Sequence, residues 1–107
     1  MANTYKSAFI DLTSTNKTTI YTVPANTTSI VKTIQLTNES GNVNTQVYVT
    51  DSSASVEYEI SHATLAARST ENFAKGPIVL EAGDIIKIQA ATANTVTGVI
   101  SFLEISF

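Results

Sequence analysis

The chain has 107 residues, with six basic and nine acidic side chains and no cysteine. This length provides for one domain with a modest core, which we assign to residues 1–107. The small net charge of -3 excludes an electrostatic footprint for nucleic acid. The lack of cysteine excludes disulfides, thiolate metal sites and a cysteine nucleophile.

Short segments with alternating apolar and polar side chains run through the whole sequence. Thr, Ile and Val make up more than a third of the residues, and their branched side chains suit a pleated surface. The alternation predicts strands over 5–12, 18–23, 29–38, 45–51, 55–62, 69–74, 77–80, 85–92 and 96–106. We therefore expect an all-β fold, a jelly-roll-like β-sandwich of about eight antiparallel strands.

Two turn phrases mark corners between strands. Val23-Pro24-Ala25-Asn26 precedes the strand near 29–38, and Glu81-Ala82-Gly83-Asp84 precedes the strand near 85–92. Pro24 presets φ for a turn, and Gly83 can adopt the positive φ that reverses a chain. One segment, 63–73, has an alanine-rich start with mild helical propensity, but its apolar residues do not continue at a spacing of 3.6. We expect an extended crossover between the sheets there.

The alternation also predicts which side chains face the core. These are Ile30, Ile34, Leu36, Val47, Val49, Val56, Tyr58, Ile60, Ile86 and Ile88. Lys32 interrupts the first set, so it must lie near an edge or extend its ammonium group to water.

The first and last strands are apolar on both sides. In the last strand Val99, Leu103 and Ile105 alternate with Ile100 and Phe102, and the first strand places Tyr5 and Phe9 opposite Ala8, Ile10 and Leu12. A strand that is apolar on both sides is either central under a covering segment or part of a subunit contact. Because a small sandwich has one interior in which to bury such residues, part of this surface is expected to meet another subunit. The predicted interface residues are Tyr5, Phe9, Ile100, Phe102 and Phe107.

The sequence offers no convincing catalytic, metal or cofactor site, and we predict that the protein is not an enzyme. His62 is the only histidine, and the adjacent Ser61 points to the opposite face of its strand. Glu57 and Glu59 share a strand face, but the spacing of a calcium loop is absent. The four glycines are too far apart to form a phosphate-binding loop. Tyr48 could stack on a sugar, although a half-buried cross-strand tyrosine explains it more simply.

One resemblance adds to these inferences. The run 20–34, the phrase 77–86 and the closing Ser101-Phe102-Leu103-Glu104-Ile105 resemble small β-sandwich virion structural proteins of tailed bacteriophages, particularly marine phages and cyanophages. The resemblance covers about residues 18–106 and carries turn and strand motifs, with no catalytic residues.

The resemblance implies assembly on a virion, as a capsid decoration (cement) protein or as a tail, head-to-tail or fibre component. The expected partners are the major capsid protein or other virion proteins, and further copies of the chain in a homo-oligomer. The N-terminal residues lack a secretion signal and no apolar run is long enough for a membrane span, so synthesis in the host cytoplasm is expected. A carbohydrate-binding module for host attachment is the alternative from another class.

Overall fold

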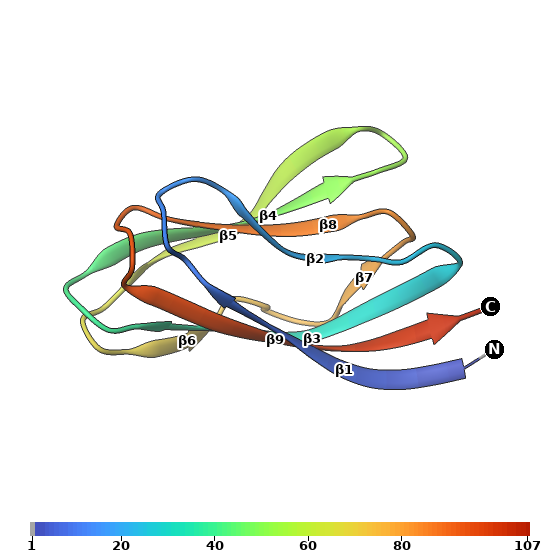
Figure 1. Ribbon diagram of the computed structural model, residues 1–107, viewed down its shortest axis with the longest axis horizontal. Coiled ribbons are helices and arrows are strands. Elements are labelled where there is room, and N and C mark those ends of the chain that lie inside the picture. The colour runs from blue at the N-terminus through green and yellow to red at the C-terminus, as the bar shows by residue number, and fades with distance from the viewer. Residues whose placement is uncertain (1) are drawn as a thin grey trace.

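The computed structural model describes residues 2–107 and consists of two packed antiparallel sheets (Figure 1). The strands are β1 (Ala2–Asp11), β2 (Thr18–Thr22), β3 (Thr27–Asn38), β4 (Val43–Asp51), β5 (Val56–Leu65), β6 (Thr70–Asn72), β7 (Ile78–Leu80), β8 (Ile85–Ala90) and β9 (Val96–Ser106). No residue in the described range is helical. The predicted all-β sandwich is therefore confirmed.

The first sheet has the order β1-β9-β3-β6, with β7 also paired to β3, and the second has the order β2-β8-β4-β5. Because β6 and β7 pair with two ends of β3, they are two parts of one interrupted strand. The chain thus forms a long ribbon of four antiparallel pairs, β1 with β9, β2 with β8, β3 with β6 and β7, and β4 with β5. Rolling this ribbon adds the pairs β9 with β3 and β8 with β4, which is a jelly roll.

The two predicted corners lie together at one end of the sandwich. Asn26 and Gly83 both have positive φ, of 56° and 88°. The amide of Val23 donates to the carbonyl of Asp84, and the amide of Gly83 donates to the carbonyl of Val23, each at 2.9 Å. Their turn character is visible in the sequence, but their contact depends on the rolled topology. The crossover is also extended as expected: β5 continues to Leu65, and β6 begins in the other sheet at Thr70.

The core fills the space between the sheets. Six of the ten predicted core residues are buried, namely Ile34, Leu36, Val47, Val49, Ile86 and Ile88. The structure adds residues that join the strands at their ends, including Leu12, Val23, Leu65, Phe73, Leu80 and Val96.

Ile30 is a wrong core prediction, and Lys32 explains why. The register between β3 and β9 shifts between Val31 and Thr33, so the exposed Lys32 sits in a β-bulge. A bulge inserts one residue and reverses the alternation beyond it. Val31 therefore points into the core before the bulge and Ile34 after it. Ile30 is left on the outer face of the first sheet.

Val56, Tyr58 and Ile60 are also wrong core predictions, with exposed fractions of 41, 52 and 41%. The register between β4 and β5 shifts between Val47 and Tyr48, which leaves Ile60 as the extra residue of a bulge. Beyond this bulge the β4–β5 hairpin projects from the body of the sandwich (Figure 1), so its apolar side chains are only partly covered.

Candidate assembly surface

Apolar residues form a continuous row across the outer face of the first sheet. Tyr5 of β1 lies opposite Leu103 of β9, which lies opposite Ile30 of β3, and Ile30 in turn lies opposite Val79 of β7. Both ends of the row are exposed, Tyr5 by 80% and Val79 by 64%. We call these four residues the outer apolar row. It crosses the sheet from one edge to the other and has no covering element among the described residues.

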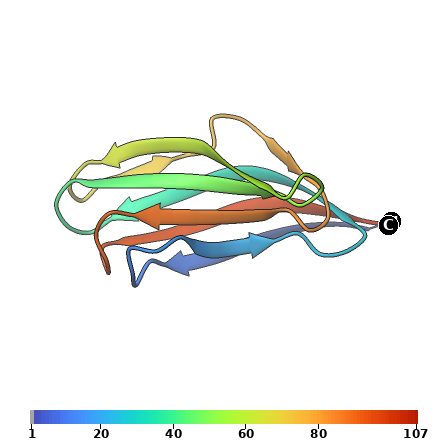
Figure 2. The same ribbon diagram turned by 90° about the horizontal axis from the view of Figure 1, so that it is seen from above.

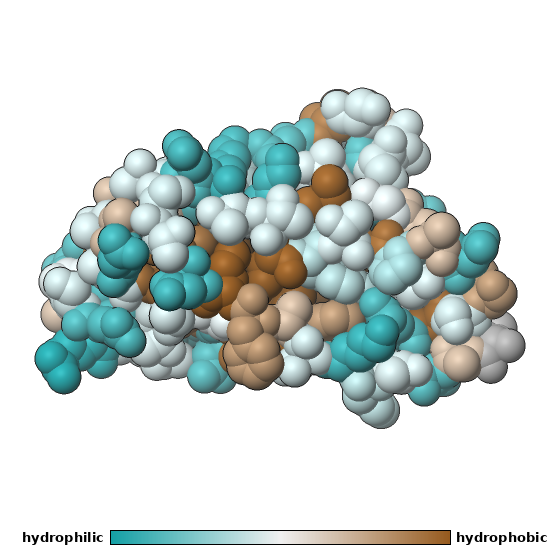
Figure 3. All heavy atoms as spheres, in the orientation of Figure 1, coloured by the Kyte–Doolittle hydropathy of each residue, from teal (hydrophilic) through white to brown (hydrophobic). Residues whose placement is uncertain are grey.

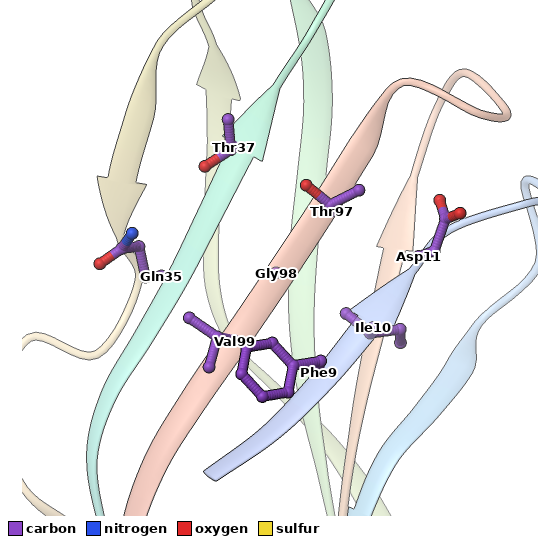
Figure 4. Close-up of a pocket in the computed structure, with 8 residues that line it drawn as sticks. All are labelled: Phe9, Ile10, Asp11, Gln35, Thr37, Thr97, Gly98 and Val99. Atoms are coloured by element: carbon purple, nitrogen blue, oxygen red, sulfur yellow. The ribbon is translucent and has the colours of Figure 1, made fainter.

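A second row lies parallel to the first and borders a shallow hollow. Phe9 lies opposite Val99, and Val99 lies opposite Gln35, with Phe9 77% exposed. The next row along the strands, on the side away from the outer apolar row, consists of Asp11, Thr97 and Thr37. Figure 4 shows these side chains around a hollow of about 530 Å³, with Gly98 in its floor. An apolar wall with a polar rim suits an apolar side chain of another protein.

The lateral side on which β1 and β2 lie also carries a strip of apolar residues. Figure 2 shows β1 at one margin of the sandwich, with β5 and β7 at the opposite margin. Figure 3 views the β1 side and shows apolar residues gathered along its middle. Ala8 and Ile10 of β1 and Ile20 of β2 pack against the core but are only partly buried. The sandwich is therefore incompletely covered at this margin.

The predicted interface residues divide into two groups. Tyr5, Phe9 and Phe107 are exposed, Phe107 by 69%, and the Phe107 amide donates to the carbonyl of Asn26. Ile100 and Phe102 are 0 and 3% exposed and belong to the core. Their placement at a surface is wrong because β9 lies between β1 and β3, and its even-numbered residues point at the second sheet. Val79 was missed because the short strand β7 shows too little alternation to reveal its outer face.

A polar cluster closes the sandwich where β9 ends. The carboxylate of Glu104, which is 8% exposed, accepts a hydrogen bond from the Tyr21 hydroxyl at 2.6 Å and lies 2.8 Å from the Lys6 ammonium. Burial opposes ionisation of Glu104, but the bonds from Lys6 and Tyr21 outweigh it and lower the carboxyl pKa. The Tyr21 ring also packs on Phe102, with 4.1 Å between centroids. The cluster ties β1, β2 and β9 together.

The catalytic and metal-binding candidates are not assembled into a site. The His62 side chain is 74% exposed, and Glu59 lies 3.8 Å from it. Between residues 2 and 107 no three His, Cys, Asp or Glu side chains converge on a common point. No helix in the same range could span a membrane.

The Tyr48 ring, the candidate sugar platform, has one of its two faces occupied. The ammonium group of Lys17 lies 4.1 Å from the ring centroid, and the Tyr48 hydroxyl donates to Gln89 at 3.2 Å. A cation over a ring uses the same face that a sugar would need.

Comparison with known proteins shows likeness in fold only. No protein-family model and no curated protein sequence matches the chain. A Drosophila NLP-core structure, described in terms of pentamer formation and histone binding, aligns with a TM-score of 0.55 and 17% identity over 95% of this chain and 98% of that one. A chain of the Bacillus endospore appendages, described as disulfide-linked pili, aligns with a TM-score of 0.52 and 14% identity over 98 and 88%. A Macrobrachium rosenbergii extra small virus particle gives 0.37 at 14% identity over 96 and 80%, too low to bear on the fold.

Proposed function

We propose that this chain is a structural protein of a virion that acts by protein–protein binding, as a capsid decoration protein of a tailed bacteriophage. The observation that carries the proposal is the outer apolar row, which extends from Tyr5 to Val79 across four strands. Monomeric proteins rarely leave a large contiguous apolar patch uncovered. The sequence resemblance to small phage virion proteins supplies the kind of assembly.

The chemistry of the row favours a protein partner over a glycan. Three of its four members, Leu103, Ile30 and Val79, are aliphatic and offer no ring on which a sugar could stack, and Tyr5 supplies the single ring of the row. The Drosophila NLP-core structure and the Bacillus appendage chain are both described as parts of assemblies, a pentamer and a pilus. The proposed partner is the major capsid protein, and a position in the tail or head-to-tail region is the runner-up. Many copies on one particle would permit each contact to be modest.

The test compares two valines on different sheets. Val79→Asp places a charge at the end of the outer apolar row, whereas Val56→Asp places one on the projecting β4–β5 hairpin. Both sites are exposed, so both variants should fold, as circular dichroism would show. We expect Val79→Asp to reduce occupancy on purified particles at least tenfold and Val56→Asp to leave it unchanged. Full occupancy of Val79→Asp, or absence of the native protein from particles, would overturn the proposal.

The position of the chain on the particle separates the two virion roles. Electron microscopy of labelled particles should show density over the capsid shell for a decoration protein. Label confined to the tail or to the head-to-tail junction would select the runner-up instead. Binding to a glycan array, combined with absence from particles, would favour the carbohydrate-binding alternative.

A further inference from the structure

The edge of β1 is long, regular and open. Its ten residues pair with β9 without a register shift, and within residues 2–107 no other strand pairs with β1. The amide and carbonyl groups along the outer edge of β1 therefore lack strand partners. Such an edge is a template for pairing with another chain, and proteins commonly protect it with charges, prolines or bulges. Of these devices β1 has only Lys6 and the terminal Asp11.

The side chains of β1 are self-complementary about Ser7. Tyr5 and Phe9 lie on the same face of the strand, at equal distances on either side of Ser7. If two copies pair antiparallel with a twofold axis through Ser7, Tyr5 lies opposite Phe9 of the second copy, and this contact occurs twice. Lys6 then lies opposite Ala8, and Asn3 opposite Asp11. Aromatic cross-strand pairs stabilise a sheet, and no like charges meet.

The neighbouring registers are worse for identifiable reasons. A twofold axis keeps the outer faces of both copies on the same side of the joined sheet. The register between the two β1 strands can therefore change only in steps that place another residue on the axis. An axis at Lys6 would bring two ammonium groups directly opposite each other. An axis at Ala8 would place Tyr5 opposite the carboxylate of Asp11. Among the three central registers of β1, centred on Lys6, Ser7 and Ala8, the sequence therefore favours Ser7.

The other long edge strand is unsuited to the same pairing. If two copies of β5 pair antiparallel so that Val56 lies opposite Ile60 of the second copy, the twofold axis passes through Tyr58. Glu57 would then lie opposite Glu59 of the second copy, twice, and like charges in that position are destabilising. The bulge at Ile60 also interrupts the regular edge of β5.

We propose that two copies of this chain associate through antiparallel pairing of their β1 edges, with Ser7 on the twofold axis. The first sheet then continues from one copy into the other. The dimer covers the margin where Ala8 and Ile10 are only partly buried, and it joins two outer apolar rows into one larger face. Twofold dimers with self-complementary contacts are the commonest form of protein oligomer. The pairing involves the edge of the sheet, so it can hold or fail independently of virion attachment through the outer face.

The absence of cysteine allows a direct test. In the proposed register the two Ser7 Cα atoms lie about 4.5–5.5 Å apart, which is within disulfide range. The matched control is Asn3→Cys, an exposed residue on the same face of β1. The two Asn3 residues would lie about 26 Å apart, at 3.3 Å per residue over eight positions. Under mild oxidation we expect at least tenfold more covalent dimer for Ser7→Cys than for Asn3→Cys.

Sedimentation of the unmodified protein gives an independent reading that needs no substitution. We expect a dimer whose dissociation constant rises at least tenfold in Ser7→Lys, because that change places two ammonium groups on the axis. A native protein that remains monomeric at its highest soluble concentration would overturn the proposal. Equal cross-linking of Ser7→Cys and Asn3→Cys would do so as well. Neither measurement involves particles, so failure here is distinct from failure of the virion role.

Discussion

The two margins of the sandwich contrast in how their edge strands meet solvent. β1 and β5 are each ten residues long, and each carries exposed apolar side chains. β5 alternates these with Glu57 and Glu59 and contains a bulge. Glu57 is further held by Lys17 at 2.6 Å and Lys87 at 3.3 Å. β1 has neither a bulge nor a run of alternating charges.

The difference teaches that exposed apolar residues alone do not define an assembly surface. On β5 they occur beside devices that discourage strand pairing. On β1 they occur beside an open and regular edge, and they continue into a row that crosses the whole sheet. The β1 edge is therefore the better candidate for strand pairing with another subunit, and the β5 edge is its natural control.

The largest expected contrast in stability concerns two isoleucines, one on β9 and one on β5. Ile100 is buried between Ala8 and Ile34 with no charged residue in its cross-strand row, whereas Ile60 is 41% exposed at the β5 bulge. Ile100→Asp should cost more than about 4 kcal/mol, because it buries an unpaired charge and empties a core position. That loss is comparable to the whole stability of a small domain. Ile60→Asp should change unfolding by about 0.5 kcal/mol or less. Urea denaturation of both variants checks this, and a folded Ile100→Asp would refute the assignment of β9.

A second contrast uses two glycines. A Cβ atom at Gly98 would lie 2.5 Å from Leu36 Cδ2 and 3.3 Å from Ile10 Cγ2, whereas one at Gly76 on the β5 side would meet nothing within 4 Å. Gly98→Ala should therefore destabilise by about 1–3 kcal/mol through overpacking. Gly76→Ala should be close to neutral. Thermal unfolding measures both, and equal midpoints would show that β1 does not pack against β3 and β9 as described.

The sequence predicts the architecture better than it predicts the faces. Alternation and turn residues predict all nine strands and the sandwich, because both signals are local. The bulge at Lys32 is not local in this sense: it becomes visible only when β3 is aligned with β9. Because of this extra residue, Val31 rather than Ile30 faces the core. Ile30 therefore lies on the outer face and becomes a member of the outer apolar row.

The candidate surface was predictable in part for the same reason. The two-sided apolar pattern distinguishes the terminal strands β1 and β9 from the others, yet it cannot say which side of β9 faces the core. Tyr5 and Phe9 are exposed as a surface role requires, while Ile100 and Phe102 are not. Strand order decides this, and strand order follows from pairings between distant residues, such as Ile100 with Ile34.

A smaller effect is expected from removing the charged side chains of the two edge strands, β5 and β1. Glu57→Thr combined with Glu59→Thr removes the like charges that oppose self-pairing of β5. Because the bulge remains, we expect only a weak new self-association, detected as a concentration-dependent rise in sedimentation coefficient. Lys6→Thr on β1 is the matched change, and it should alter dimerisation less than threefold, below about 0.7 kcal/mol. No new association of the double variant would show that the bulge alone protects β5.

The smallest expected effect is a change in acid sensitivity, which arises because the stability that a lowered carboxyl pKa contributes at neutral pH is lost. The carboxyl pKa values of Glu104 and Glu57 are both lowered. Burial opposes the ionisation of Glu104, but hydrogen bonds from Lys6 and Tyr21 outweigh it and lower its pKa. The pKa of Glu57 is lowered chiefly by the hydrogen bond from Lys17. A carboxyl whose pKa is lower in the folded state contributes stability above its unfolded value, near 4.5, and loses it as the pH falls through the folded value. Both Glu104→Gln and Glu57→Gln should therefore flatten the acid limb of the stability profile.

Added salt screens the surface pair at Glu57 but acts little on the buried carboxylate of Glu104. At 1 M salt the Glu57→Gln profile should thus coincide with that of the native protein, while the Glu104→Gln profile stays flatter. If salt removed both differences equally, the Glu104 cluster would be as open to solvent as the β5 surface, and the β1 margin would lose its distinctive anchor.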